Sequence, residues 1–228
     1  MRPRHLSLPI ESARLRLRLP TPRDAPSWLR ILRSRRVAAL MVPEIPWTEA
    51  RVRAKIARAR AEARQGTTFE LAIELRETGR VIGRVALKRV RFGFEWNAEL
   101  AYWIAADSWG SGFAHEAAYA LCDAGFRQLG LHRIEADALA FNRRSIATLR
   151  RLGFRTEGAR REEFRHRGAW IGLVCFGLLR GELRAPRPGA AAATPESVGV
   201  RGPRPSSSSR AGAARRTARP RTRTNPSR

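Results

Sequence analysis

The chain has 228 residues, which is enough for one domain with a sizeable core. Its net charge is +25. No apolar run reaches the roughly 18–20 residues of a membrane span, and the N-terminus lacks the apolar stretch of a signal peptide. Two cysteines, Cys122 and Cys175, supply neither a disulfide framework nor a metal set, so we expect a cytoplasmic protein without a metal centre.

The positive charge is unevenly distributed along the chain. Residues 185–228 contain ten arginines, one acidic residue and almost no large apolar side chain, which predicts a disordered basic tail. The remaining charge is spread along the sequence instead of being gathered in one segment. Contact of the tail with RNA, the ribosome or a membrane surface stays open, and so does an arginine bias without function, as a GC-rich genome would produce.

The spacing of apolar residues and of helix-ending glycines predicts eleven elements. In chain order they are a strand at 14–19, helices at 24–36 and 48–64, strands at 69–75, 81–90 and 95–105, a helix at 113–129, a strand at 132–139, a helix at 143–152, and strands at 154–159 and 170–178. This order predicts an α/β (α+β) fold in which helices cover both faces of a mixed sheet.

Residues 109–114, Trp-Gly-Ser-Gly-Phe-Ala, connect the strand at 95–105 with the helix that follows it. A glycine-rich turn that leads into a helix presents unpaired backbone N–H groups to an anion. Gly110 and Gly112 have no Cβ, so the backbone can approach a phosphate closely. The segment therefore indicates a pyrophosphate site, although the same residues also suit an ordinary loop.

Six segments together resemble the GNAT acetyltransferase superfamily, and within it the branch that acetylates the N-termini of ribosomal proteins. They are Ala13-Arg14-Leu15-Arg16-Leu17-Arg18, Glu99-Leu100-Ala101-Tyr102-Trp103-Ile104, Trp109-Gly110-Ser111-Gly112-Phe113-Ala114, Gly130-Leu131-His132-Arg133-Ile134-Glu135-Ala136, Asn142-Arg143-Arg144-Ser145 and Leu152-Gly153-Phe154. The resemblance implies a GNAT domain at residues 10–182, with a mostly antiparallel central sheet of about seven strands flanked by helices on both faces.

The resemblance also implies acetyl-CoA as the acetyl donor. Trp109 stands where the family's loop usually begins with Gln or Arg, whereas Gly112 and Ala114 fit the pattern. The strand before the loop should diverge from its neighbour, which leaves backbone groups free to pair with the pantetheine arm and to polarise the thioester carbonyl. The implied cofactor-binding residues are Gly110, Ser111, Gly112, Phe113, Ala114 and His115 in the loop, and Tyr102, Trp103 and Ile104 in the strand.

Acetyl transfer to an amine needs a proton acceptor, donors for the developing oxyanion and a proton source for the leaving thiolate. Glu99 lies on the strand before the loop and matches an acidic position common in this branch. It is therefore the candidate catalytic base, acting directly or through water. A solvated strand glutamate without a catalytic role is the alternative, and Glu95 and the pair Glu162 and Glu163 are other candidate bases.

Asn142 and Ser145 begin the helix at 143–152 in an Asn-x-x-Ser pattern. Asparagine is a favoured N-cap, so a structural role for Asn142 is the simplest interpretation. The resemblance adds that Asn142 contacts the pantetheine arm and that Ser145 is catalytic, as the proton donor near the sulfur. The Tyr102 hydroxyl is the alternative acid, and His115 is expected to neighbour the phosphates through its backbone.

These patterns predict an N-acetyltransferase that moves an acetyl group from acetyl-CoA directly to a primary amine, with a protein N-terminus as one acceptor. A small-molecule acceptor (an antibiotic, a polyamine or an amino acid) is the alternative, as is a non-catalytic acyl-CoA-binding or ribosome- and RNA-associated protein. The sequence leaves open the acceptor and the choice between monomer and homodimer. The positive charge of the folded part disfavours a polycationic acceptor.

Overall fold

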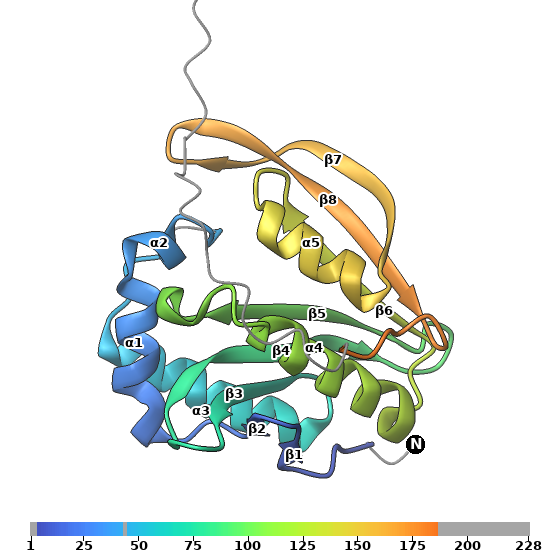
Figure 1. The fold of residues 1–228 in the computed structure, drawn as a ribbon, viewed down its shortest axis with the longest axis horizontal. Coiled ribbons are helices and arrows are strands. Elements are labelled where there is room, and N and C mark those ends of the chain that lie inside the picture. Colours follow the sequence, from blue (N-terminus) through green and yellow to red (C-terminus); the bar gives the residue numbers. More distant parts are fainter. Residues whose placement is uncertain (1–3, 43–44, 187–228) are drawn as a thin grey trace, which may run out of the picture. The chain divides into compact units, whose positions relative to one another are not determined.

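The computed structural model describes residues 4–42 and 45–186, and a sheet of eight strands runs through them (Figure 1). The strands lie in the order β1-β2-β3-β4-β5-β6-β8-β7 across the sheet. Their bounds are Ile10–Glu11 for β1, Leu15–Arg18 for β2, Phe69–Leu75 for β3, Val81–Arg91 for β4, Asn97–Ile104 for β5, Arg133–Leu139 for β6, Arg155–His166 for β7 and Ala169–Leu179 for β8. Among these strands only the β5–β6 pair is parallel, so the expected mixed, mostly antiparallel sheet is confirmed.

Helices cover both faces of this sheet, as the element order predicts. Their bounds are Ala25–Arg33 for α1, Arg35–Ala38 for α2, Glu49–Gln65 for α3, Phe113–Ala124 for α4 and Arg143–Leu152 for α5, with 3-10 turns at Pro22–Asp24 and Ala106–Ser108. On one face Trp28 of α1 and Ile56 of α3 form a buried cluster with Trp103 of β5. On the other face Leu121 of α4 and Leu149 of α5 belong to a second, larger cluster.

Local signals set the ends of several helices. The Thr48 side chain accepts the N–H of Arg51 at the start of α3, and Gly66 ends that helix with a φ of 73°. The prediction of a single helix at 24–36 is wrong. Ser34, with a ψ of 125°, separates α1 from α2. That value lies outside the helical region, so α2 starts in a new direction after Ser34.

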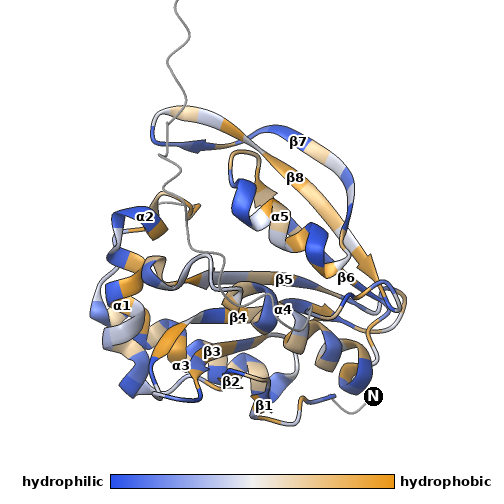
Figure 2. Cartoon of the chain, in the orientation of Figure 1, coloured by the Kyte–Doolittle hydropathy of each residue, from blue (hydrophilic) through white to orange (hydrophobic). Residues whose placement is uncertain are grey.

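The ends of two other predicted elements also differ from the structure. The helix expected at 113–129 is α-helical to Ala124 and continues as a π-helical turn at Gly125–Leu129. The strand expected at 154–159 extends to His166 as β7, which lies at one edge of the sheet. Nearly all residues of β7 are exposed and the apolar residues of this hairpin lie mainly on β8 (Figure 2), so β7 lacks the apolar alternation that predicts a strand.

The parallel strands β5 and β6 separate soon after they meet. Their register contains only three residue pairs, from Asn97 opposite Arg133 to Glu99 opposite Glu135. Beyond Glu99, β5 continues to Ile104 beside β4, whereas β6 continues beside β8. The expected divergence of the strand before the loop is therefore present, and Glu99 lies at the point where it begins.

Both ends of the described part extend slightly beyond the expected domain at 10–182. Leu6 is buried and the Arg184 N–H donates to the carbonyl of Leu152. The predicted basic tail lies, from residue 187 onward, outside the described residues. Across residues 4–42 and 45–186, no helix has the length and apolar character to cross a membrane.

Candidate active site

The loop between β5 and α4 contains two glycines with a left-handed backbone. Gly110 and Gly112 have φ values of 84° and 79°, in the left-handed region that favours glycine. Gly112 is the N-cap of α4 and offers no side chain to the first turn of the helix. The N–H groups of that turn are therefore available to an anionic ligand, and the helix dipole favours negative charge there. The loop residues from Gly110 to His115 come together at this helix end.

Trp109 holds the loop against the end of β5. Its indole N–H donates to the carbonyl of Ile104 at 2.8 Å, and its ring packs against both hydrophobic clusters. The guanidinium groups of Arg36 in α2 and Arg144 in α5 lie 4.8 and 4.9 Å from the centre of this ring. Sequence reasoning missed both arginines, because nothing local indicates that α2 and α5 meet at Trp109.

The free edge of β5 identifies which backbone groups face the gap between β5 and β6. The Ala105 N–H donates to Ile82 of β4, whereas the Ile104 carbonyl points away from β4 to Trp109. Because main-chain groups of successive residues point to opposite sides of a strand, the N–H and C=O of Tyr102 face the gap. Of the three strand residues predicted to bind the cofactor, Tyr102 therefore offers its main chain most directly, and Trp103 pairs with Arg84 of β4.

The Tyr102 side chain crosses to the start of α5. Its hydroxyl oxygen lies 3.0 Å from Ser145 Oγ, so either group can donate to the other. Asn142 accepts the N–H of Ser145 at 3.2 Å, which confirms Asn142 as the helix N-cap. Burial raises the pKa of Tyr102 to about 12, although the hydrogen bonds with Ser145 and Thr148 act in the opposite direction. Tyr102 is therefore a neutral phenol at neutral pH, beside the predicted proton donor.

Glu99 has a different environment on the opposite face of the same strand. Its side chain forms ion pairs with Lys88, at 2.6 Å, and with Arg89, and it is 16% exposed. Side chains alternate between the two faces of a strand, so Glu99 and Tyr102 lie on opposite faces of β5. The two cations favour the charged carboxylate. The candidate base and the two candidate acids therefore lie on opposite faces of the sheet, where β5 begins to separate from β6.

A buried charge network lies on the same face of the sheet as Glu99. Glu70 forms ion pairs with Lys55, at 2.9 Å, and with Arg84, at 2.7 Å. Burial alone would raise the pKa of Glu70, but Arg84 and Lys55 outweigh it and lower that pKa. Burial, together with Arg84, lowers the pKa of Lys55 and of Lys88. This network connects the cations around Glu99 to α3, and sequence reasoning did not identify it.

The other candidate residues have less central positions. Glu95 is exposed and pairs with Arg91. Glu162 and Glu163 lie in β7 at an irregularity between Arg160 and Phe164. His115 lies in the first turn of α4, where burial lowers its pKa and a hydrogen bond joins it to the backbone of Arg151. No group of three His, Cys, Asp or Glu residues in the described ranges could hold a metal ion.

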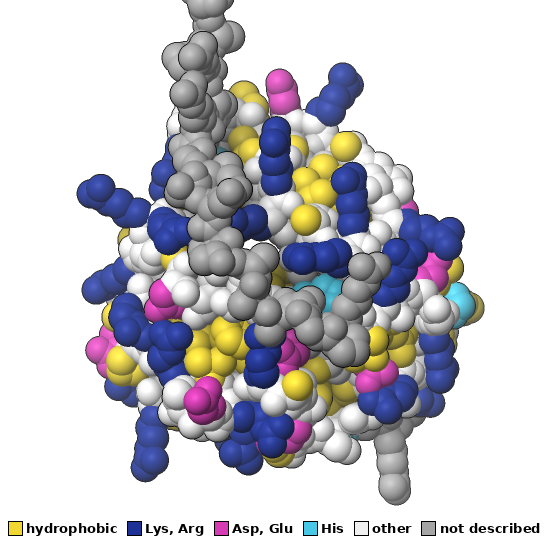
Figure 3. Space-filling view, in the orientation of Figure 1, with side chains coloured by type: hydrophobic (Ala, Val, Ile, Leu, Met, Phe, Trp, Pro, Cys, Tyr) yellow, Lys and Arg dark blue, Asp and Glu magenta, His cyan; other side chains and the backbone are white. Residues whose placement is uncertain are grey.

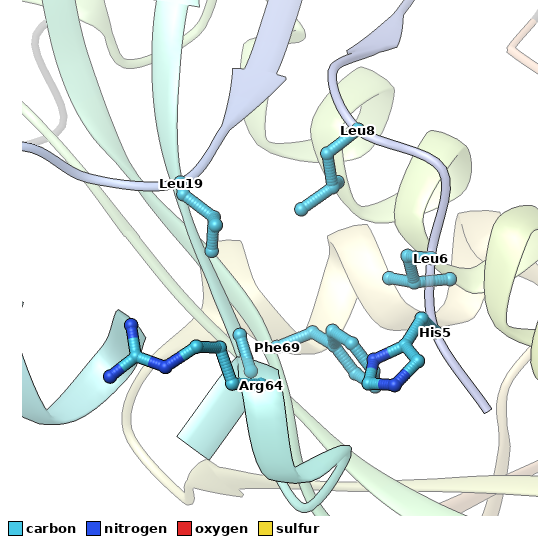
Figure 4. Close-up of a pocket in the computed structure, with 7 residues that line it drawn as sticks. His5, Leu6, Leu8, Leu19, Arg64 and Phe69 are labelled. Carbon is cyan, nitrogen blue, oxygen red and sulfur yellow. The ribbon is translucent and has the colours of Figure 1, made fainter. Parts of the chain in front are cut away.

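Two hollows on the surface of the described residues lie away from the loop. A cavity of about 440 Å³ lies between the N-terminal segment, β2 and the end of α3, where leucines, His5 and Phe69 line it (Figure 4). Another, of about 640 Å³, is lined by residues 160–163 of β7. On the visible face, lysine and arginine side chains are scattered over the whole surface (Figure 3). The candidate site consists of the loop and the free edge of β5.

Comparison with known proteins identifies the family of the chain. The model of the acetyltransferase (GNAT) domain family matches residues 14–155, which include the loop, both faces of β5 and all of α5. The chain belongs to the GNAT acetyltransferase family. Acetyl-CoA is the acetyl donor in this family, and the left-handed glycines, uncapped helix start and free strand edge fit such a ligand.

Several GNAT proteins are similar to the chain. An uncharacterized N-acetyltransferase p20 of Bacillus licheniformis is 36% identical over 52% of this chain and 66% of its own length. A putative ribosomal N-acetyltransferase of Bacillus subtilis, YdaF, is 35% identical over 37% of this chain and 46% of its own length. The chain therefore spans about half to two thirds of these curated relatives. The solved structure of Mycobacterium smegmatis RimJ with CoA-disulfide superposes with a TM-score of 0.68 at 30% identity, covering 75% of this chain and 84% of RimJ.

Proposed function

We propose that this GNAT protein transfers an acetyl group from acetyl-CoA to a primary amine, and that the acceptor is a protein N-terminus. The gap between β5 and β6 supports this proposal, because the glycine loop lies at one end of it and the candidate proton-transfer groups lie on the two faces of β5 beside it. The name of YdaF, a putative ribosomal N-acetyltransferase, supports a protein acceptor.

Acetyl-CoA supplies the acetyl group as a thioester. In the proposed mechanism, the N–H groups at the start of α4 bind its pyrophosphate, and the main chain of Tyr102 pairs with the pantetheine arm and donates to the developing oxyanion. These contacts orient the thioester beside the amine, so no covalent enzyme intermediate is needed. The residues proposed to bind acetyl-CoA are Gly110, Ser111, Gly112, Phe113, Ala114, His115, Tyr102 and Asn142, together with Trp103 and Ile104 next to Tyr102 in β5.

Glu99 accepts the proton of the acceptor amine, directly or through one water. The amine nitrogen then forms a bond to the carbonyl carbon, and the bond from that carbon to sulfur breaks. Ser145 donates a proton to the leaving sulfur, and Tyr102, within hydrogen-bond distance of Ser145, restores it or donates in its place. Glu99 accepts a proton on one face of β5, and Ser145 or Tyr102 donates a proton on the other face, so the two proton transfers are spatially separate.

Thiol release from acetyl-CoA in the presence of candidate acceptors tests this function. We expect release with peptides that have a free N-terminus and none with the same peptides blocked at the N-terminus, with the acetyl group found on the terminal nitrogen by mass spectrometry. Faster release with polyamines, aminoglycosides or amino acids than with any peptide would favour the small-molecule alternative. Failure of acetyl-CoA to raise the melting temperature would contradict the whole proposal.

A further inference from the structure

A buried carboxylate lies next to the proposed phosphate loop. Glu116 is in the first turn of α4, four residues after Gly112, and its side chain is only 9% exposed. An unpaired anion at this position would repel the phosphates that the loop is proposed to bind, and its own burial would be unfavourable. Some other group must therefore compensate its charge.

Arg14, immediately before β2, provides this compensation. Its Nε and Nη2 each lie 2.7 Å from Glu116 Oε2, and its backbone N–H donates to Oε1 at 2.8 Å. The Ser12 hydroxyl donates to the same oxygen at 2.8 Å. Both oxygens of Glu116 thus have partners, and the pair is neutral as a unit.

The same arginine contacts the loop itself. Arg14 Nη1 donates to the carbonyl of Ser111 at 3.0 Å, and the guanidinium lies 4.4 Å from the centre of the Phe113 ring. A trans peptide is planar, with its C=O and N–H pointing in opposite directions. Holding the Ser111 carbonyl toward Arg14 therefore directs the Gly112 N–H away from Arg14.

We infer that Arg14 and Glu116 are positioning residues, which fix the orientation of the Ser111–Gly112 peptide so that its N–H faces the cofactor phosphates. This inference rests on the proposed function, because it assigns the loop to the pyrophosphate of acetyl-CoA. Arg14 acts through the loop backbone, and Glu116 acts by holding the guanidinium in place. The loop sequence does not indicate this contact, since 97 residues separate Arg14 from Ser111.

Three variants separate positioning from charge compensation and from folding. Arg14→Leu leaves Glu116 buried and unpaired, so we expect both lower stability and weaker cofactor binding. The double variant Arg14→Leu with Glu116→Gln removes both charges and should recover most of the stability. Its affinity for CoA should remain about tenfold below that of the wild type, because the Ser111 carbonyl is still not held. Arg16→Leu with Glu11→Gln, which removes an exposed ion pair between β2 and β1, is the matched control.

Three measurements together report on the loop. Calorimetric titration of the double variant should show the reduced affinity for CoA. Its turnover of S-acetyl-pantetheine, which has no phosphates, should equal that of the wild type. Hydrogen exchange of residues 109–115 without ligand should be faster in the double variant and unchanged in the control. Wild-type CoA affinity in the folded double variant would overturn the inference, and so would an equal loss with S-acetyl-pantetheine. Absence of CoA binding by the wild type would instead contradict the proposed function.

Discussion

The loop between β5 and α4 and the two faces of strand β5 contribute different kinds of groups to the candidate site. The loop presents main-chain groups, whose directions depend on two left-handed glycines and on the start of a helix. Besides the free main-chain edge at Tyr102, strand β5 presents side chains, with Glu99 among cations on one face and Tyr102 beside Ser145 on the other. Substitutions in the loop should therefore affect cofactor binding, and substitutions on β5 should affect proton transfer.

The largest expected effect concerns the charged face of β5. Glu99→Gln keeps the shape of the side chain but removes its basicity, so turnover should fall by about 100-fold or more. Affinity for acetyl-CoA should change little, because the loop is untouched. Steady-state kinetics with calorimetric titration check both values. Glu95→Gln is the control, since Glu95 is also paired with an arginine but is exposed. Wild-type turnover in Glu99→Gln would show that water or another carboxylate, and not Glu99, is the catalytic base.

The next effect concerns the loop. Gly112→Asn should weaken acetyl-CoA binding by about tenfold or more, because asparagine tolerates a positive φ but adds a Cβ where the backbone meets the pyrophosphate. The control is Gly79→Asn, whose φ of 68° is similar and whose added Cβ meets no atom within 4 Å. Both variants should lose similar stability in thermal melts. An equal affinity for acetyl-CoA in the two variants would contradict the assignment of the loop.

A smaller effect is expected on the neutral face of β5. Ser145→Ala or Tyr102→Phe alone should lower kcat by roughly tenfold, since each hydroxyl can partly replace the other, and the double variant should lose more than either. Cofactor affinity should stay near the wild-type value in the single variants. Simple multiplication of the two single effects in the double variant would show that the two hydroxyls act independently.

The raised pKa of Tyr102 gives this face a pH signature. The folded state favours neutral Tyr102, so its contribution to stability is present below pH 10 and is lost as the pH rises toward its folded pKa of about 12. An absorbance titration of tyrosinate should therefore show one late-ionising tyrosine in the folded protein. Tyr102→Phe should remove this component and leave the other tyrosine, Tyr119.

The smallest effect is expected from residues 185–228. Their removal should change turnover of a small amine by less than about twofold, because the segment lacks the apolar residues to pack on the domain. Binding to RNA or ribosomes across a salt series tests the other interpretation, in which the arginines give steep salt dependence. A collapse of small-amine turnover would show that the tail belongs to the active fold.

Several features follow from the sequence because neighbouring residues determine them. Thr48 and Gly66 end α3 at nearly the predicted positions, and Asn142 caps α5. The glycine-rich turn at Gly110 and Gly112 leads into a helix, as its sequence indicates. In each case a few adjacent residues fix the backbone, so the signal is contained in a short segment.

The tertiary structure decides what depends on residues far apart in the chain. The break at Ser34, the length of β7 and the contacts of Trp109 with Arg36 and Arg144 have no local signal. Likewise, Tyr102 meets a serine 43 residues away, and Arg14 meets a carboxylate 102 residues away. The residue types and their periodicity therefore determined the elements, the family resemblance and the loop. Only packing across the sheet decided which charges and hydroxyls lie together, because such contacts depend on strand order and register instead of on neighbouring residues.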